Sequence, residues 1–598
     1  MSPSSPPVRS GRYEAARVVL QSTFGYPDFR PPQRRAVQAV LSDRDALIVL
    51  PTGGGKSLCY QVPALVRDGL TVVISPLISL MKDQVDTLVR KGVSASFVNS
   101  TLSAREVADR MDRARDGSLK LLYLAPERLE AGRTLDTLVR IGVSLLAVDE
   151  AHCISEWGHD FRPSYRRIGQ MRAQLGMPQT VALTATATPA VRSDIVHQLA
   201  LRDPAVVVGG FDRVNLTYHV VSARTPHVRN RSVIAWLQAA RGPAIVYAPT
   251  RTAVEQVTAV VVRHGIRAVA YHGGLDPGRR QRAQDAFMQE RTRVIVATSA
   301  FGMGIDKPDV RLVVHHAMPG SLEAYYQEAG RAGRDGQPST CVLMHAIPDR
   351  ATHEFLLASA HPHRAAIERI WQILCAHADA TGFVGLSSAD AARQLPRGVG
   401  PRTVEAAVRV LATAGACTLV PASKERIWIR LLATPERIRG ELDGARRVDR
   451  DVLRALWRVA GPRMEEGTVI NLQALPSALG GQQGLVPIIE RLTAQQFVTW
   501  LPVGGGVRLE ARWQSAAALP VDWHALARRR DVDLGKLDAM QRYAQTRHCR
   551  RAYVLRYFGD HEVHSPCDAC DRCLGITGVL PPVAASPAVR NQSCPRPF

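Results

Sequence analysis

The first stretch of this sequence that could do chemistry is a glycine-rich turn that ends in a lysine and a serine. Glycines let backbone N–H groups close around phosphate oxygens, a lysine ammonium reaches the β- and γ-phosphates of a nucleotide, and a serine hydroxyl can ligate Mg²⁺. A chance glycine turn is the alternative. The residues predicted to bind the nucleotide in this way are Thr52, Gly53, Gly54, Gly55, Lys56 and Ser57.

Two adjacent carboxylates stand 93 residues after Lys56, where a second apolar run ends. Asp149 is predicted to hold Mg²⁺ together with Ser57, and Glu150 to orient and deprotonate an attacking water. A lone Asp-Glu-Ala-His run is a weak signal. Its pairing with the Gly-Lys-Ser turn predicts hydrolysis of a nucleoside triphosphate.

A different chemistry is predicted near the end of the chain, where three cysteines recur at every third position. With one more cysteine upstream they could bind a zinc ion through four thiolates. Free reduced thiols are the alternative, since ten cysteines spread over 598 residues do not form a disulfide framework. The predicted ligands are Cys549, Cys567, Cys570 and Cys573.

The elements that must position the phosphate and carboxylate residues are parallel strands. From residue 35 to about 345, short apolar runs alternate with amphipathic stretches. Runs that are apolar at consecutive positions suit strands covered by helices on both faces. The sequence therefore predicts an α/β fold with two sheets in tandem, one within residues 1–207 and the other within 208–350.

Beyond residue 360 the pattern changes to helices followed by short strands, and it occurs twice. Three helices and a hairpin form a winged helix, so the sequence predicts one over residues 360–435 and another over 445–512. Unrelated helical segments are the alternative. The predicted hairpins pair 417–420 with 426–430, and 497–501 with 507–510.

The zinc ligands close a basic helical stretch, and together they define a predicted module over residues 521–575. Within 521–558 there are nine Lys or Arg against four Asp, so a phosphate backbone could dock beside the zinc ion. The proline-rich residues 576–598 are expected to be a disordered tail.

Residues 24–336 resemble the RecQ-type DNA helicases of superfamily 2. Leu50 stands where the strict phosphate-loop pattern has glycine, and this departure favours the helicase version of the loop. The resemblance implies that the two sheets are RecA-like lobes, of which the first binds ATP. The stretches that carry it include Phe24-Gly-Tyr-Pro-Asp-Phe-Arg-Pro-Pro-Gln33, Cys153-Ile-Ser-Glu-Trp-Gly-His-Asp-Phe-Arg-Pro163 and Gln327-Glu-Ala-Gly-Arg-Ala-Gly-Arg-Asp-Gly336.

The resemblance also implies a nucleotide site to which both lobes contribute. Gln33 would read the adenine edge through its amide, with Tyr26 and Arg30 beside it. Arg334 would be an arginine finger and Arg331 its neighbour, because charge develops on the γ-phosphoryl group during transfer. The other residues implied at this site are Gln327, Gly304 and Asp306.

A loop directly after the carboxylates resembles the family's aromatic-rich loop, which couples single-strand binding to hydrolysis. Trp157 and Phe161 offer faces for unpaired bases, worth about 1 to 3 kcal/mol per base, and Arg162 supplies charge. Ordinary core aromatics are the alternative. The other implied DNA contacts are Ser75, His159 and Thr298.

The order of the later domains departs from the better-known family arrangement, in which the zinc module follows the second lobe directly. Here it lies behind the two predicted winged helices. This departure puts in doubt any transfer of strand-separating residues. Trp428 and the hairpin at 500–508 are the candidates for that role.

The expected activity is that of an ATP-dependent 3′–5′ DNA helicase, the polarity being implied by the family, with a role in DNA repair or recombination. Its expected cofactors are ATP, Mg²⁺ and Zn²⁺, and its partners are single-stranded and partial-duplex DNA. An RNA helicase or translocase with the same motor is one alternative, and a DNA-binding scaffold with an inactive ATPase is another. A zinc module with winged helices favours DNA, and the full set of hydrolysis residues opposes a scaffold.

Composition agrees with a nucleic-acid partner. Lys plus Arg exceed Asp plus Glu by 76 to 54, a net charge of +22, although an arginine-biased composition could explain much of the excess. No run approaches the roughly 18 apolar residues that a membrane span needs, and the first residues do not resemble a signal peptide. A cytoplasmic protein is expected, associated with the nucleoid in a prokaryote.

Overall fold

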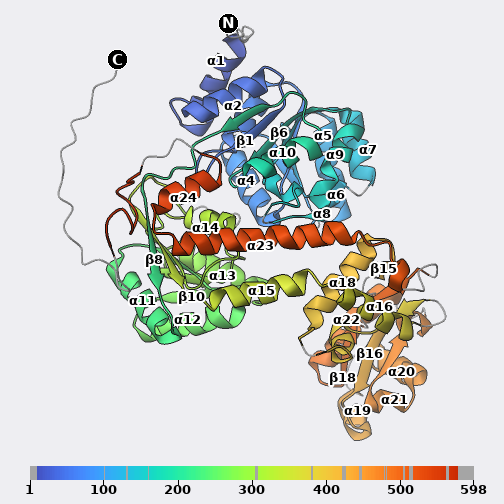
Figure 1. Ribbon diagram of the computed structural model, residues 1–598. Helices are drawn as coiled ribbons and strands as arrows, with labels where there is room; N and C mark the ends of the chain where they lie inside the picture. Colours follow the sequence, from blue (N-terminus) through green and yellow to red (C-terminus); the bar gives the residue numbers. More distant parts are fainter. Residues whose placement is uncertain are drawn as a thin grey trace, which may run out of the picture. The chain divides into compact units, whose positions relative to one another are not determined.

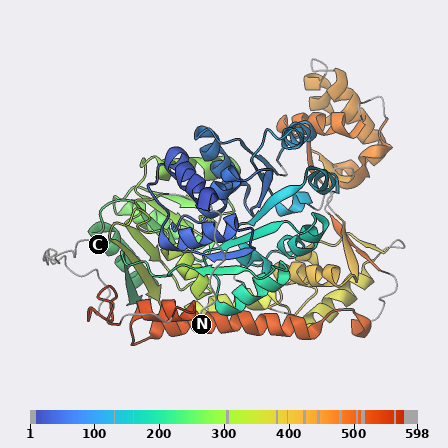
Figure 2. The ribbon, with the colours of Figure 1, turned by 90° about the horizontal axis from the view of Figure 1, so that it is seen from above.

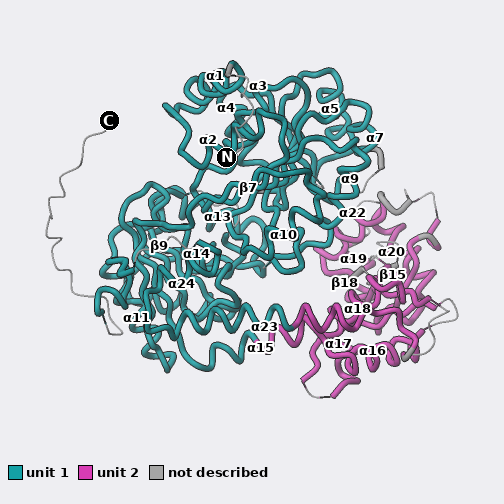
Figure 3. The backbone as a smooth tube through the Cα atoms, turned by 45° about the horizontal axis from the view of Figure 1, so that its top comes forward, with its two compact units in different colours: residues 1–353, 531–598 teal, residues 354–530 magenta. Residues whose placement is uncertain are grey.

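The structure, a computed structural model, describes residues 10–576 except 100, 130–131, 159, 303–306, 379–381, 397, 421–425, 443–446, 477–478, 480, 503–504, 511–515 and 561–564. The chain forms two compact units (Figure 3). Unit 1 consists of residues 1–353 and 531–598, and unit 2 of residues 354–530. Both boundaries fall inside helices, α15 (Asp349–Ala360) and α23 (Trp523–Gln545).

The first lobe of unit 1 is a seven-stranded parallel sheet with the order β3-β4-β2-β5-β6-β1-β7 (Figure 1). Its central strands are mostly apolar because helices cover both faces, although Thr71 in β2 and Thr180 in β6 are buried polar residues. The strands are β1 (Ala46–Val49), β2 (Leu70–Ile74), β3 (Ala95–Val98), β4 (Leu121–Leu124), β5 (Val143–Val148), β6 (Gln179–Thr184) and β7 (Ala205–Val208). The helices are α1 (Ser10–Val19), α2 (Pro31–Leu41), α3 (Leu58–Val66), α4 (Ile78–Arg90), α5 (Ala104–Arg115), α6 (Pro126–Leu129), α7 (Gly132–Ile141), α8 (Pro163–Arg166), α9 (Ile168–Gln174) and α10 (Pro189–Gln198).

The second lobe is a six-stranded parallel sheet with the order β10-β11-β9-β12-β13-β8. Its core is built largely from valine, as the β-branched runs of the sequence predict. The strands are β8 (Leu216–Ser222), β9 (Ala244–Tyr247), β10 (Ala268–Tyr271), β11 (Val294–Ala297), β12 (Leu312–His315) and β13 (Ser339–His345). The helices besides α15 are α11 (Pro226–Ala239), α12 (Arg251–Arg263), α13 (Pro277–Met288) and α14 (Leu322–Ala329). The prediction of two parallel-sheet lobes is confirmed.

The zinc module lies against the second lobe although it is remote from it in sequence. Figures 1 and 2 show its helices α23 and α24 (Arg550–Tyr557), in red, beside the green strands and helices of that lobe. Phe558 stacks on Phe211 with ring centroids 4.8 Å apart, and the Tyr543 hydroxyl donates to the Tyr325 hydroxyl at 3.0 Å.

The module also covers the edge strand β8. Tyr218 N donates to Ala569 O at 3.1 Å, Asp571 N donates to Tyr218 O at 2.9 Å, and Val220 N donates to the Asp571 carboxylate at 3.0 Å. The backbone beside the cysteines therefore extends the sheet of the second lobe by a short parallel bridge.

Unit 2 contains two small domains, each with a three-stranded antiparallel sheet. The outer domain, residues 364–420 and 506–526, has one core formed by both segments. The inner domain, residues 426–502, has a core of its own. The outer elements are α16 (Arg364–Ala376), β14 (Phe383–Val384), α17 (Ser388–Arg393), α18 (Pro401–Thr413), β15 (Cys417–Val420) and β19 (Gly506–Leu509). The inner elements are β16 (Arg426–Leu431), α19 (Pro435–Leu442), α20 (Arg447–Ala460), α21 (Arg463–Glu466), β17 (Thr468–Asn471), α22 (Gly481–Ala494) and β18 (Val498–Pro502).

Both predicted hairpins are wrong. Strand β15 pairs with β19 and not with β16, while β16 is the central strand between β17 and β18. The inner domain is thus inserted between two strands of the outer one, in place of the predicted tandem over 360–435 and 445–512. The reason is burial: Ile427 and Ile429 of β16 lie in the inner core, whereas Val507 of β19 lies in the outer core.

Among the described residues no helix combines the length and the apolar character needed to cross a membrane. The residues 577–598, for which a disordered tail was expected, lie outside the described part of the chain.

Candidate functional site

The phosphate loop joins β1 to α3 at the carboxyl edge of the first sheet. Gly53 and Gly55 have positive φ angles of 79° and 72°, which side-chain-bearing residues rarely adopt. A Cβ atom at Gly55 would also clash with the Gln33 side-chain amide, and one at Gly54 would lie 2.8 Å from Pro51 O. Glycine is therefore required at these positions by conformation and by space.

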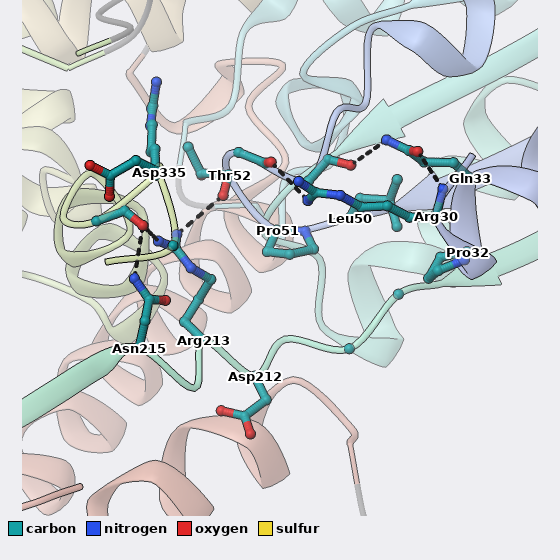
Figure 4. Close-up of a pocket in the computed structure, with 17 residues that line it drawn as sticks. Arg30, Pro32, Gln33, Leu50, Pro51, Thr52, Asp212, Arg213, Asn215 and Asp335 are labelled. Carbon is teal, nitrogen blue, oxygen red and sulfur yellow. Dashed lines mark hydrogen bonds between the residues drawn. The ribbon is translucent and has the colours of Figure 1, made fainter. Parts of the chain in front are cut away.

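A cavity of about 360 Å³ opens beside this loop, and both lobes line it (Figure 4). The first lobe contributes the loop and the start of α2, and the second contributes the turn that holds the predicted arginine finger. The lining residues are Arg30, Pro32, Gln33, Leu50, Pro51, Thr52, Gly53, Gly54, Gly209, Gly210, Asp212, Arg213, Asn215, Gly333, Arg334, Asp335 and Gly336.

The predicted hydrolysis residues of the first lobe lie together. Asp149 and Glu150 directly follow β5, and their charges act on the Lys56 ammonium, whose pKa is lowered mainly by burial. Burial, reinforced by the adjacent Glu150, raises the pKa of Asp149 to about 7. The Lys56 ammonium donates to Leu50 O at 3.4 Å. A carboxylate, a hydroxyl at Ser57 and a lysine around a phosphate-sized loop form a donor set that fits Mg²⁺ and a nucleotide.

Gln33 connects helix α2 to the phosphate loop. Arg30-Pro-Pro starts the helix, and Gln33 Oε1 of the side-chain amide accepts from the backbone N of Arg30, the residue before the helix, at 2.9 Å. The Gln33 amide donates to Gly54 O at 2.9 Å, so the group expected to read adenine is held against the loop in this structure. Tyr26, 52% exposed, lies nearby in sequence with its ring open to a stacking base.

The predicted arginines of the second lobe approach the same loop. Arg334 lies close enough to lower the pKa of Lys56, and its side chain lies beside Gly53. Arg331 is buried, with 5% of its surface exposed, and its charge acts on the Tyr247 hydroxyl, whose pKa is raised mainly by burial. Gln327 is half-buried near the end of α14.

Arg213 joins the two lobes and was not among the predicted site residues. Its guanidinium donates to Thr52 O of the phosphate loop at 3.2 Å (Figure 4). It also donates to the Gly330, Ala332 and Gly333 carbonyls of the second lobe at 3.0, 2.7 and 2.8 Å. Asn215 holds the same turn through Gly333 O at 2.8 Å. Both lie within residues 24–336, which resemble the family, but the sequence could not show which carbonyls they bond, because those bonds form only where the two lobes meet.

The aromatic loop, residues 153–163, follows the carboxylates through a buried histidine. His152 Nδ1 lies 2.9 Å from Thr184 Oγ1 and 3.2 Å from the Glu150 carboxylate. Trp157 is 44% exposed and Phe161 is half-buried. Arg162 is engaged within the loop, with the Asp160 carboxylate at 3.1 Å.

The other predicted DNA contacts differ in how exposed their side chains are. Ser75 is 1% exposed and offers no surface to a strand in this arrangement. Thr298 is half-buried after β11, and its hydroxyl accepts from Ala300 N at 3.4 Å. His159, Gly304 and Asp306 lie outside the described residues.

The strand-separating candidates of unit 2 are not at a free hairpin. Trp428 is in the central strand β16, and its ring packs against Gly467, where a Cβ atom would clash with it. Trp500 and Arg508 lie in β18 and β19, which belong to different sheets.

The four predicted zinc ligands come together. The sulfur atoms of Cys549, Cys567, Cys570 and Cys573 all lie within 4.8 Å of one another, which fits a four-thiolate zinc site. Two arginines beside the ligands are engaged in hydrogen bonds. Arg550 forms a buried pair with Asp571 inside the module at 2.5 Å, whereas Arg551 docks the module on the second lobe by donating to Leu216 O at 2.7 Å.

A second group of potential ligands, His152, Cys153 and Asp160, also lies within 4.8 Å. Its members already have partners, because Asp160 is paired with Arg162 and His152 contacts Thr184. These side chains are better described as the packing that joins the carboxylate motif to the aromatic loop.

A cavity lined by the phosphate loop and by Arg213 and Arg334 of a second RecA-like lobe, together with two carboxylates whose charges act on Lys56, defines a two-lobed P-loop NTPase of the helicase type. Three family models match: DEAD/DEAH box helicase over residues 30–194, helicase conserved C-terminal domain over 229–336 and RecQ zinc-binding over 513–574.

The chain is similar in sequence to several proteins named as helicases. The chain is 47% identical over 345 residues to the ATP-dependent DNA helicase RecQ of Bacillus subtilis (strain 168), covering 57% of this chain and 58% of that protein. It is 42% identical over 343 residues to the probable ATP-dependent DNA helicase RecS of the same organism, covering 56% and 68%. It is 41% identical over 391 residues to the ATP-dependent helicase wrn-1 of Caenorhabditis elegans, covering 62% and 35%. The chain belongs to the RecQ family of superfamily 2 helicases.

The matches cover 54–58% of the RecQ proteins of Bacillus subtilis, Pasteurella multocida and Haemophilus influenzae. The chain thus spans little more than half the length of these curated relatives.

Proposed function

We propose that this protein is an ATP-dependent DNA helicase that moves 3′ to 5′ on single-stranded DNA and unwinds partial duplexes. The observation that carries the proposal is the single cavity lined by the phosphate loop and by Arg213 and Arg334 of the opposite lobe. A site that needs both lobes for completion can couple hydrolysis to their opening and closing.

Each hydrolysis residue has a role that its position supports. The Lys56 ammonium would bind the β- and γ-phosphates, and Ser57 with Asp149 would hold Mg²⁺, which would neutralise phosphate charge. Glu150 orients and deprotonates the attacking water. Arg334, aided by Arg331, stabilises the charge that develops on the γ-phosphoryl oxygens.

The substrate is single-stranded DNA held in part by the aromatic loop. Trp157 has an exposed ring on which a base can stack, and Phe161 adds a second aromatic face. Arg162 would contact phosphate after leaving Asp160. A role in DNA repair or recombination, in the cytoplasm or at a nucleoid, is the setting we infer for this activity.

Strand displacement on partial duplexes with 3′ or 5′ tails tests the proposal. With ATP and Mg²⁺ we expect unwinding from the 3′ tail alone. The Lys56→Ala variant should lose at least about 100-fold in DNA-stimulated ATPase rate, while Lys91→Ala, which removes an exposed lysine of the same lobe, should match the wild type. Unwinding only from a 5′ tail would overturn the polarity, and equal activity on tailed RNA duplexes would favour an RNA helicase.

A further inference from the structure

A buried lysine of the zinc module contacts the aromatic loop. Lys536, in the middle of α23, has 8% of its surface exposed. Its ammonium donates to Gly158 O at 2.7 Å and to the Asp533 carboxylate at 3.0 Å. The contact joins residues that are 378 positions apart, and nothing in the sequence pattern of either segment indicates it.

The chemistry of this contact is specific. A buried ammonium is costly unless its N–H groups have acceptors, and here a backbone carbonyl and one carboxylate supply them. The chain uses arginine for nearly all its basic positions, with only seven lysines among 76 basic residues. One of the seven is the phosphate-loop lysine and another is Lys536. A lysine in a chain that otherwise uses arginine indicates a site that fits a compact ammonium and not a planar guanidinium.

The acceptor residue is rigidly placed against the carboxylate motif. Gly158 N donates to Ser155 O at 3.0 Å, and a Cβ atom at Gly158 would clash with His152 O. Because His152 contacts both Glu150 and Thr184, a movement of Gly158 is transmitted to the hydrolysis residues through one short turn. Trp157, the exposed aromatic residue, directly precedes Gly158.

The helix that carries Lys536 is anchored to the other lobe. Its Tyr543 hydroxyl donates to Tyr325 at 3.0 Å, and Arg350 pairs with its Asp538 at 2.6 Å. Helix α23 therefore connects the second lobe to the aromatic loop of the first lobe. The Lys536 side chain makes this connection through its hydrogen bond to Gly158 O.

We propose that Lys536 is a positioning residue that transmits the zinc module's position to the aromatic loop and so sets how strongly single-stranded DNA stimulates ATP hydrolysis. This inference rests on the proposed function. It adds a specific residue of the zinc module to the coupling between the DNA strand and the hydrolysis site.

The test compares three variants of the full-length protein with the wild type. Lys536→Met removes the ammonium and keeps the apolar stem, Lys536→Arg keeps a charged donor, and Arg528→Met is a matched control that removes an exposed basic residue of the same helix. The measurements are ATPase rates without DNA and with saturating oligo-dT, the oligo-dT dissociation constant, the KM for ATP and the zinc content.

For Lys536→Met we expect the ratio of DNA-stimulated to basal rate to fall about tenfold, with basal rate, KM and zinc content within twofold of the wild type. Lys536→Arg should recover at least half of the stimulation, and Arg528→Met should retain it. A wild-type ratio in Lys536→Met would overturn the inference, and so would equal losses in basal rate, zinc content and stimulation.

Two further outcomes are separable. If Lys536→Met is insoluble, Lys536→Gln, which retains an amide donor, takes its place with the same expected loss and the same contradicting result. If the wild type itself shows no stimulation by DNA, the proposed function fails. If DNA stimulates the wild type, Lys536→Met and Lys536→Gln to the same extent, the proposed function stands and only the role of Lys536 fails.

Discussion

Arg213 shows how a single side chain can make a nucleotide site depend on two lobes. A guanidinium offers five N–H donors in a fixed plane, and Arg213 uses them on carbonyls of the phosphate loop and of the arginine-finger turn. These bonds join Thr52 of the first lobe to Gly330 of the second through one side chain. The sequence identified the segment but could not indicate which carbonyls it would meet.

We therefore expect Arg213→Ala to lower the DNA-stimulated ATPase rate by at least about tenfold, because several charge-assisted hydrogen bonds of the site are lost. Arg213→Lys should recover little, since an ammonium cannot reach carbonyls on both lobes. Steady-state ATPase assays measure the effect, with the exposed Arg224→Ala as the control. A variant as active as the wild type would show that the bridge is dispensable.

The raised pKa of Asp149 predicts that Mg²⁺ binding depends on pH. Burial, reinforced by Glu150, raises this pKa to about 7 from 3.8, so between these pH values the folded protein keeps a proton on Asp149 that the unfolded chain has lost. The stability of the folded state therefore falls as pH rises from about 4 to 7. If Asp149 holds Mg²⁺ as proposed, the ion has to displace this proton.

The apparent affinity for Mg²⁺ with nucleotide should be about tenfold weaker at pH 6 than at pH 8. Calorimetric titrations in two buffers of different ionisation enthalpy should show proton release at pH 6 and little at pH 8. Asp149→Asn should abolish that release. An affinity that is the same at both pH values would contradict the raised pKa.

At the scale of elements, the positions of the strands could be predicted from the sequence, but which strands pair with each other could be predicted only in part. The apolar runs at 46–50, 121–124 and 294–297 form strands within one residue of those limits, because a strand covered by helices on both faces is mostly apolar. The pairing in unit 2 was not predictable in this way. Adjacent strands suggested hairpins, but the side chains of β15 and β16 enter different cores.

A matched pair of glycines tests the packing of the inner domain. Gly467 has φ of 99° and lies against the Trp428 ring, so Gly467→Ala should destabilise this domain by about 2 to 4 kcal/mol. Gly440, inside α19, has open space around it, and Gly440→Ala should be neutral or stabilise by up to about 1 kcal/mol. Thermal unfolding measures both free-energy changes. Equal stability of the two variants would refute the packing of Trp428 on Gly467.

The predicted zinc ligands and the residues that dock the module on the second lobe are neighbours in the chain, as Cys570 and Asp571 show. Cys570→Ser should lower the zinc content from about one per chain to well below half. Since Asp571 follows Cys570 and bonds Val220 of β8, amide exchange over 216–222 should also accelerate. Cys375→Ser, outside the cluster, is the control. Full zinc content in Cys570→Ser would discredit the ligand set.

At the scale of the whole molecule, unit 2 is an insertion between the second lobe and the zinc module. The sequence showed the displacement of the module along the chain as a departure from the family. In the structure the module nevertheless lies against the second lobe, because Phe558 stacks on Phe211 and Asp571 accepts a hydrogen bond from Val220 N of β8. Composition and motifs gave no sign of this, because a contact between residues hundreds of positions apart depends on how the intervening chain folds.

The covered edge of β8 has a consequence for synthesis on the ribosome. Val220 leaves the ribosome 351 residues before its partner Asp571. At roughly 5–20 residues per second, the nascent second lobe waits about 18–70 s with this edge unprotected. Unpaired strand edges invite association between chains. Nascent chains of this protein therefore pass through a period in which shielding by a chaperone, or spacing between ribosomes, decides how many reach the native state.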